Sequence, residues 1–145
     1  MPVRNMIFKN GCYYHVYNRG VSKNDIFYRN CDRDRFLRKV RYYSEKFGVS
    51  VLSYALMNNH FHFFVRQDRD GGIKNFLQKL QQSHSLYFNL KYRREGALFE
   101  SRFKAKEVTK EDYFLDVQKY IANNPFKVKV SSERGIASSG LNLRG

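Results

Sequence analysis

The feature that most constrains the fold of this chain is a pair of strand-like stretches separated by two asparagines. Residues 49–57 and 60–67 are rich in β-branched and aromatic side chains, and the dipeptide between them is a typical turn. Because successive side chains of a strand point to opposite faces of a sheet, we expect His60 and His62 to share one face. The opposite face would carry Phe61, Phe63 and Val65 and would lie against helices.

Amphipathic helical patterns flank this hairpin on both sides. Residues 32–48 space their apolar side chains as a helix does, with Asp32 expected as the N-cap and Gly48 just past the end. Residues 73–94 show the same spacing over a longer stretch with a basic end. Each helix therefore has an apolar face that must pack against another element.

Further strands and a last helix complete the pattern. Residues 12–20 read as a first strand, and residues 96–108 read as a loop followed by a fourth strand. Thr109 and Asp112 have capping-box spacing and predict a final helix from about residue 110 to 123. That helix would end before a proline, because the residue preceding proline avoids the helical region.

The order β-α-β-β-α-β followed by a helix is the ferredoxin-like (RRM-like) pattern. This is an α+β fold in which an antiparallel sheet carries two helices on one face. We expect a single domain over residues 1–130 and a flexible, basic, Ser/Gly-rich tail over residues 131–145. The open face of the sheet is expected to carry His15, Tyr17, Arg19, His60, His62 and Phe64.

The charge of the chain points to a polyanionic partner. Its 27 Lys and Arg residues against 13 Asp and Glu residues give a net charge of +14, and Phe and Tyr are interleaved with the basic residues. Such a surface suits nucleic acid, because it neutralises phosphates and stacks bases. The two cysteines lie far apart, so neither a disulfide framework nor a zinc knuckle is expected. With no signal peptide and no membrane-spanning run in the sequence, the expected location is the cytoplasm.

The two histidines can supply two nitrogen ligands to a divalent cation. Tyr120 and Asn124 are four residues apart, so they share a face of the last helix. Asn124 offers a carbonyl oxygen suited to Mg²⁺ or Mn²⁺, and a cation beside Tyr120 could polarise a scissile phosphate. Taken singly, a His-x-His pair is more often a surface feature and a helical tyrosine more often part of a core. With the basic charge and the open sheet face also considered, one phosphodiester-cleaving centre and these separate structural roles stay equally open from the residues alone.

Segments of the chain resemble a known family from about Tyr13 to Lys127. "MNNHFHFFV" resembles the HUH motif (His, hydrophobic, His) of the single-tyrosine transposases of insertion sequences. "YIANNP", from Tyr120 to Pro125, resembles the Tyr-x-x-x-Asn-Pro segment of the REP-associated tyrosine transposases. "YHVYNRG" and "GALFESRFKAKEV" are also similar to segments of that superfamily.

The resemblance implies a metal-dependent transposase. His60 and His62 would hold Mg²⁺ or Mn²⁺, and Tyr120 would attack single-stranded, hairpin-forming DNA to give a 5′-phosphotyrosine link and a free 3′-hydroxyl. Asn124 would complete the metal site where insertion-sequence relatives often carry Gln, a departure that favours the REP-associated branch. Relatives act as homodimers or as monomers, and the sequence is compatible with both.

Basic residues of the predicted strands and helices are expected to contact DNA phosphates. Lys104, Lys106 and Arg102 alternate along the fourth strand and would share a face. His15 could lie beside the two histidines in the sheet, and we expect it as a DNA contact or a buried polar residue rather than a third metal ligand. The complete set of predicted DNA contacts is Arg19, Arg93, Arg94, Arg102, Lys104, Lys106 and His15.

Other functions remain open at this point. A non-catalytic binder of single-stranded DNA or RNA, including an inactive descendant of a transposase, would have the same order of elements. A phosphoesterase with two His-x-Thr/Ser motifs is disfavoured. The chain has one His-x-His pair but no His-x-Thr or His-x-Ser sequence.

Overall fold

The computed structural model describes residues 6–109 and 111–112, which form one sheet of four strands and two long helices. The strands are β1 (Tyr13–Arg19), β2 (Val49–Leu56), β3 (His60–Gln67) and β4 (Lys104–Val108). The helices are α1 (Asn30–Phe47) and α2 (Gly72–Tyr92), and a short 3-10 helix, η2 (Val21–Lys23), follows β1. This order confirms the predicted α+β, ferredoxin-like pattern.

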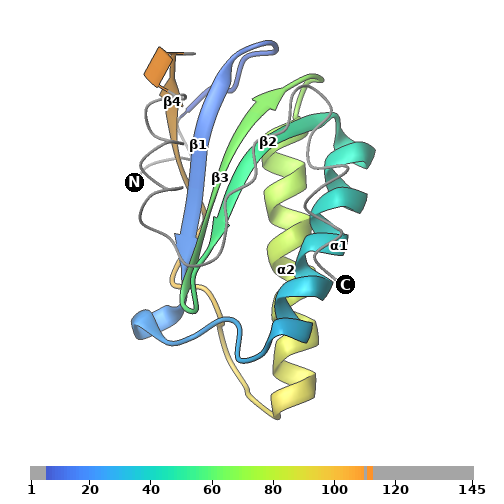
Figure 1. Ribbon diagram of the computed structural model, residues 1–145, viewed down its shortest axis with the longest axis vertical. Helices are drawn as coiled ribbons and strands as arrows, with labels where there is room; N and C mark the ends of the chain where they lie inside the picture. The colour runs from blue at the N-terminus through green and yellow to red at the C-terminus, as the bar shows by residue number, and fades with distance from the viewer. Residues whose placement is uncertain (1–5, 110, 113–145) are drawn as a thin grey trace.

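The four strands lie in the order β2-β3-β1-β4, with every neighbouring pair antiparallel. Both long helices cover the same face of the sheet (Figure 1). β3 lies inside the sheet, where His62 is opposite Tyr17 of β1 and Ala55 of β2. The predicted turn of two asparagines joins β2 to β3.

The helix-covered face of the sheet carries the core. Phe61, Phe63 and Val65 of β3 are fully buried, as are Tyr14 and Val16 of β1, so the predicted alternation is confirmed. From the helices the core receives Phe36, Leu37, Val40, Ile73, Phe76, Leu77, Leu80 and Phe88. Burial of large aromatic side chains dominates the apolar stabilisation of such a core.

The opposite face is not open over its whole width, contrary to the prediction. Phe64 lies on this face but is buried, together with Leu52, Ala55 and Val108. Pairing of β2 with β3 shifts register after Val51, and Leu52 joins this second cluster rather than the core. The open part of the face is therefore confined to the end that carries the histidines.

The N-cap of the first helix lies three residues earlier than predicted. Arg29, not Asp32, is the N-cap, and α1 starts at Asn30. The Asp32 carboxylate reaches back and accepts hydrogen bonds from the backbone N–H groups of Tyr28 and Arg29, both at 3.0 Å. The helix ends as predicted at Gly48, whose φ of 76° is a left-handed conformation that favours glycine.

A buried carboxylate also joins the start of α1 to the end of α2. Asp32 accepts hydrogen bonds from Tyr87 Oη (2.6 Å), Tyr92 Oη (2.8 Å) and Lys91 Nζ (3.1 Å). Burial alone would raise the pKa of Asp32, but hydrogen bonds from the tyrosines and from two backbone N–H groups outweigh it and hold that pKa well below its usual range. The carboxylate is therefore charged and satisfied inside the fold.

The turn after β1 requires glycine. A Cβ on Gly20 would lie 2.0 Å from the carbonyl oxygen of Asn24, a contact that real Cβ atoms do not make. The N–H of Gly20 donates to the carbonyl oxygen of Asn59 (2.9 Å). Gly20 thus holds η2 beside the β2–β3 turn.

The start of the predicted final helix lies within the described residues. Thr109 Oγ1 accepts a hydrogen bond from the backbone N–H of Asp112 (2.9 Å), and Glu111 and Asp112 are helical. The remainder of that helix, with Tyr120 and Asn124, lies outside the described residues, as does the predicted tail. Across the described ranges, we find no helix with the length and apolar character that a membrane crossing requires.

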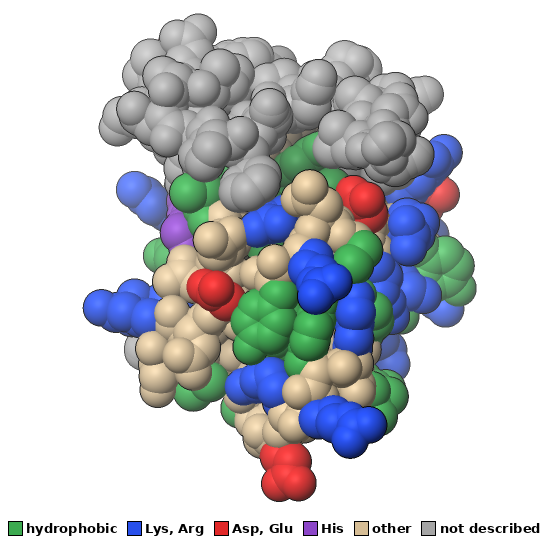
Figure 2. Space-filling view, turned by 60° about the horizontal axis from the view of Figure 1, so that its bottom comes forward, with side chains coloured by type: hydrophobic (Ala, Val, Ile, Leu, Met, Phe, Trp, Pro, Cys, Tyr) green, Lys and Arg blue, Asp and Glu red, His purple; other side chains and the backbone are tan. Residues whose placement is uncertain are grey.

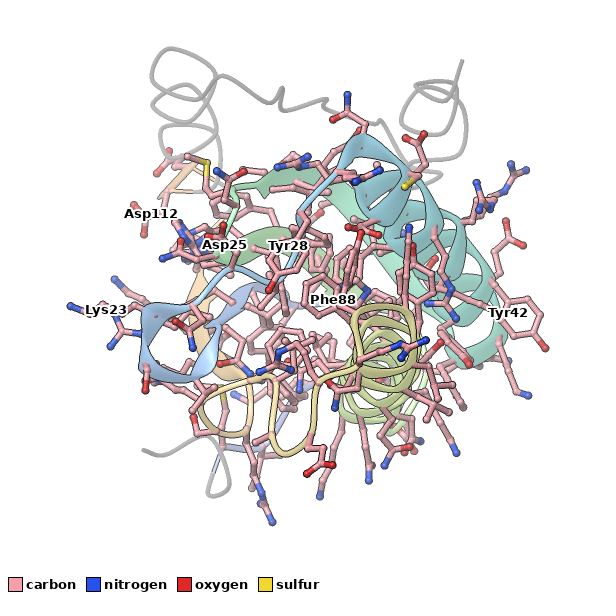
Figure 3. All side chains as sticks on the ribbon, turned by 90° about the horizontal axis from the view of Figure 1, so that it is seen from below. Lys23, Asp25, Tyr28, Tyr42, Phe88 and Asp112 are labelled. Atoms are coloured by element: carbon pink, nitrogen blue, oxygen red, sulfur yellow. The ribbon has the colours of Figure 1, made fainter. Side chains whose placement is uncertain are left out.

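Basic side chains are spread over the end of the molecule that lies at the bottom of Figure 1, and a hydrophobic patch lies among them (Figure 2). Seen from below, α1 and α2 lie side by side, and Tyr28 lies near Phe88 of α2 (Figure 3). His84 of α2 is buried in the same region, and its Nε2–H donates to the carbonyl oxygen of Ile26 (2.7 Å).

Replacing Asp32 with Asn should lower the free energy of unfolding by about 3 kcal/mol, because the protein would lose a buried charge paired with Lys91 and bonded by two tyrosines. Urea unfolding of the wild type and the variant measures the difference. Asp34→Asn on the same helix is the control and should cost less than about 1 kcal/mol. Equal effects of the two substitutions would contradict this account.

Acidification should destabilise the protein through His84. Burial lowers the pKa of His84 to about 4, from 6.5 in an exposed chain. The unfolded chain therefore binds this proton first, so the stabilisation is complete above about pH 6.5 and is lost as the pH falls toward 4. Between pH 7 and pH 5 the wild type should lose about 2 kcal/mol more than His84→Gln, which retains a hydrogen-bond donor. Urea denaturation of the wild type and of His84→Gln at both pH values measures these losses. An equal loss of stability in the two proteins would refute the prediction.

Candidate functional site

The two predicted histidines lie side by side on the sheet face opposite the helices. His60 begins β3 and His62 follows two residues later, so the strand period places both on one face. Their rings are 4.9 Å apart between centroids and nearly perpendicular, at 86°. Both side chains are half-buried, so a ligand can reach them while the sheet holds their backbone.

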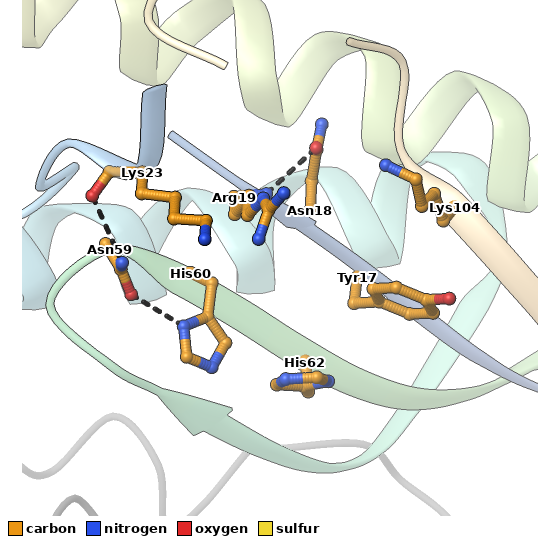
Figure 4. A pocket seen from close by; sticks show the side chains of 8 residues that line it. All are labelled: Tyr17, Asn18, Arg19, Lys23, Asn59, His60, His62 and Lys104. Carbon is orange, nitrogen blue, oxygen red and sulfur yellow. Dashed lines mark hydrogen bonds between the residues drawn. The ribbon is translucent and has the colours of Figure 1, made fainter. Parts of the chain in front are cut away.

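Each histidine is oriented by a neighbour through its Nδ1 atom. His60 Nδ1 lies 2.7 Å from Asn59 Oδ1, so the ring donates a hydrogen bond to the amide oxygen (Figure 4). His62 Nδ1 lies 2.7 Å from His15 Nε2, and one of these rings donates to the other. A cation held by both His60 and His62 would therefore be coordinated through Nε2 of each ring.

His62 belongs to a cluster of flat rings on this sheet face. The His15 ring stacks on His62 at 4.9 Å and on Phe64 at 4.8 Å. The Tyr17 ring lies 5.5 Å from His62 and 4.8 Å from His15. These contacts restrict rotation of the His62 ring, and the hydrogen bond to His15 engages its Nδ1 atom.

The environment keeps both candidate ligands neutral near pH 7. Burial, followed by the nearby rings of His15 and His60, lowers the pKa of His62 to about 3. Burial and the positive charge of Arg19 lower the pKa of His60 below its usual value. Neutral imidazole is the form that binds metal ions.

A cavity of about 430 Å³ opens in front of the two histidines (Figure 4). Its lining combines the histidines with aromatic, amide and basic side chains. The lining residues are Tyr17, Asn18, Arg19, Lys23, Asn59, His60, His62 and Lys104. The mixture offers contacts to both a nucleobase and a phosphate.

Three basic side chains give the cavity its positive charge. Arg19 forms an ion pair with Glu100, and Lys104 Nζ lies 3.9 Å from the same carboxylate. Lys23 has a φ of 63°, a left-handed conformation that is uncommon outside glycine. These cations suit phosphate oxygens and can position a DNA backbone.

The described residues could provide part of a metal site. Two neutral imidazoles beside an accessible cavity fit a divalent cation, but the described residues contain no group of three or more His, Cys, Asp or Glu side chains arranged to hold a metal ion. His15 directs its Nε2 atom at His62 Nδ1, so that nitrogen is already engaged. The remaining predicted ligand, Asn124, and the predicted nucleophile, Tyr120, lie outside the described residues.

The predicted DNA-contacting residues fall at different places. Arg19 and Lys104 line the cavity, and Lys106 is exposed on the same sheet face, opposite His15 in the pairing of β4 with β1. Arg93 and Arg94 follow α2 and are not among the cavity residues.

The expectation that Arg102 shares a face with Lys104 and Lys106 is wrong. β4 starts at Lys104, so the strand alternation does not extend back to Arg102. Arg102 instead lines a separate cavity with Lys74 and Gln78 of α2.

Three residues that line the cavity have no predicted role in the site: Asn18, Lys23 and Asn59. Asn18 is buried and its amide donates a hydrogen bond to Gln81 of α2. The sequence predicts only a turn at Asn59. The position of Asn59 directly before His60 could have indicated its contact with that ring, since a residue and its neighbour are always close. Nothing in the sequence indicated Lys23, because its position depends on the turn after Gly20.

The model of the family described as "Transposase IS200 like" matches residues 8–124. No curated protein matches the sequence.

Two solved structures share the fold at low sequence identity. A REP-associated tyrosine transposase, solved bound to a REP hairpin, has 12% identity and a TM-score of 0.59, covering 84% of this chain and 72% of that chain. A protein of Deinococcus radiodurans R1 described as a transposase has 14% identity and a TM-score of 0.57, covering 80% of this chain and 92% of that chain. These likenesses show the shared fold, and the family match over most of the chain shows that the chain belongs to the IS200-like transposase family.

Proposed function

We propose that this transposase cleaves and rejoins single-stranded DNA next to a hairpin, using a divalent cation and a tyrosine nucleophile. The observation that carries the proposal is the pair His60 and His62, neutral and oriented at the floor of a cavity that basic side chains line. Hairpin DNA is proposed as substrate because a structural relative binds a REP hairpin. The strong positive charge of the chain agrees with it.

His60 and His62 would hold Mg²⁺ or Mn²⁺, and the amide oxygen of Asn124 would complete the site. When bound, the cation polarises the scissile phosphate and stabilises charge on the oxygen that leaves. His15 and Asn59 keep the histidine rings in place through their Nδ1 atoms.

Tyr120 would supply the nucleophile. Its phenolic oxygen attacks phosphorus, the bond from phosphorus to the 3′ oxygen breaks, and the 5′ end becomes joined to the tyrosine. The phenol loses one proton and the departing 3′ oxygen gains one. Rejoining reverses these steps when a 3′-hydroxyl attacks the phosphotyrosine, so no external energy source is needed.

Basic side chains of the cavity would hold the phosphate during both steps. Arg19, Lys23 and Lys104 line the space in front of the histidines. They neutralise the phosphate oxygens before the reaction, and this favours attack by a phenolic oxygen. Such contacts set the position of the strand and do not read its sequence.

A non-catalytic binder of single-stranded nucleic acid is the second candidate function. The half-buried rings of His15, His62 and Tyr17 favour it, because flat rings on a sheet face can stack bases. Such a protein would retain DNA under native conditions and form no covalent adduct.

Incubation with labelled hairpin DNA carrying single-stranded flanks should give a covalent protein–DNA adduct with Mn²⁺ and none with EDTA. Tyr120→Phe should abolish the adduct, because it removes the nucleophilic oxygen, and His62→Ala should lower its rate at least about 100-fold by removing a metal ligand. A denaturing gel measures both.

Tyr113→Phe replaces a second tyrosine of the same predicted helix. This variant is the control and should react normally. An adduct with Tyr120→Phe would overturn the proposal, and native retardation without any adduct would favour the binder.

The contact of His15 with His62 predicts a loss of metal affinity on substitution. His15→Phe retains a flat ring between Phe64 and His62 but removes the nitrogen that bonds His62 Nδ1. Affinity for Mn²⁺, measured by calorimetry without DNA, should fall about 10- to 100-fold. His15→Gln, which can restore a polar contact, should recover part of it. Unchanged affinity in His15→Phe would show that the contact does not support the metal site.

A further inference from the structure

An exposed aromatic cluster lies at the end of the molecule where α1 begins and α2 ends. The rings of Tyr28, Phe88 and Tyr92 contact one another, with centroid distances of 4.7 Å, 4.6 Å and 4.8 Å. Phe88 is buried beneath, whereas Tyr28 is 50% exposed. Figure 3 shows Tyr28 and Phe88 close together in this region. One flat ring is therefore presented to solvent on an aromatic support.

The backbone that carries this ring is firmly attached. The N–H of Tyr28 donates to the Asp32 carboxylate (3.0 Å). The N–H groups of Ile26 and Phe27 both donate to the carbonyl oxygen of Asn58, at 2.8 Å and 3.2 Å. A ring held this way loses little conformational entropy when a partner stacks on it.

Cations surround the cluster. Lys91 Nζ lies 5.3 Å from the centre of the Tyr92 ring, and the guanidinium of Arg94 lies 5.9 Å from the centre of Phe88. Arg29 and Arg93 adjoin the cluster along the chain and are exposed. Figure 2 shows basic side chains beside a hydrophobic patch at this end of the molecule.

Acidic side chains do not cancel this charge. Asp32 is buried and its carboxylate is engaged by Tyr87, Tyr92 and Lys91. Asp25 and Glu95 are exposed nearby in the chain and remain outnumbered by the cations. The surroundings of the ring therefore suit an anionic partner with flat groups, which is the chemistry of a nucleic-acid strand.

The cluster is connected to the histidine cavity through the β2–β3 turn. Asn58, which anchors the segment before Tyr28, also accepts a hydrogen bond from Arg33. Asn59, the next residue, lines the cavity and contacts His60. The turn that anchors the backbone before Tyr28 thus also lines the histidine cavity, through the adjacent residue Asn59.

We propose that Tyr28 stacks an unpaired base of the single strand that runs from the histidine cavity. Arg29, Arg93 and Arg94 would hold the phosphates on either side of that base. The proposal rests on the proposed function, because it assumes that single-stranded DNA occupies the cavity. In this proposal the surface around Tyr28 retains the DNA strand during cleavage and takes no part in the cleavage reaction.

The experiment measures binding of the full chain to hairpin DNA with a single-stranded flank, in EDTA, so that cleavage does not enter. 2-Aminopurine is placed at successive flank positions, and its fluorescence falls when it stacks on an aromatic ring. Tyr28→Leu retains an apolar cover over Phe88 but has no flat ring, and Tyr28→Phe retains the ring. Tyr42→Leu is the matched control: Tyr42 is 54% exposed and has Lys39 and Lys46 near its ring, but it lies elsewhere on α1 (Figure 3).

We expect fluorescence quenching at one flank position, and about a tenfold loss of affinity with loss of that quenching in Tyr28→Leu. Tyr28→Phe and Tyr42→Leu should bind as the wild type does. For the blunt hairpin without a flank, Tyr28→Leu should bind normally. Normal flank binding by Tyr28→Leu, or an equal loss with the blunt hairpin, overturns the proposal. In either case, an adduct formed by the wild type with Mn²⁺ would still support the proposed function.

Discussion

The alternation of side chains along β3 is the constraint on which the rest of the structure depends. β3 is paired on both edges, so a shift by one residue would expose Phe61 and Phe63 and turn the histidines into the core. Both helices pack on those phenylalanines. The packing of the core therefore also decides on which face His60 and His62 lie. The same strand that supplies core residues positions both candidate ligands.

The β2–β3 turn and the Asp32 network organise the end of the molecule around that site. Asn59 contacts His60 and accepts from Gly20, while Asn58 holds the segment that leads to α1. Asp32 then joins this segment to the end of α2. One chain of hydrogen bonds thus links the cavity to the aromatic and basic surface at this end of the molecule.

Period-two and helical spacing predicted the element order, the buried face of β3 and the pairing of the two histidines, because these follow from local geometry. Alternation predicts Phe64 on an open face, but Phe64 is buried, since burial depends on what covers a face. Alternating charges do not define where a strand begins, so they misplace Arg102. The sequence predicts Asp32 as an N-cap, but its carboxylate binds the backbone of preceding residues and side chains of α2. The ferredoxin-like pattern allows His15 to lie beside the two histidines, whereas its hydrogen bond to His62 Nδ1 depends on the register of β1 with β3.

The central claim is that His60 and His62 together hold a divalent cation. Pulsed electron paramagnetic resonance of Mn²⁺ bound to the full chain detects nitrogen nuclei bonded directly to the metal. The account predicts modulation from two imidazole nitrogens in the wild type, about half of that nitrogen contribution in His60→Ala or His62→Ala, and none in the double variant. Bound Mn²⁺ without nitrogen coupling, or coupling that survives in the double variant, would contradict it.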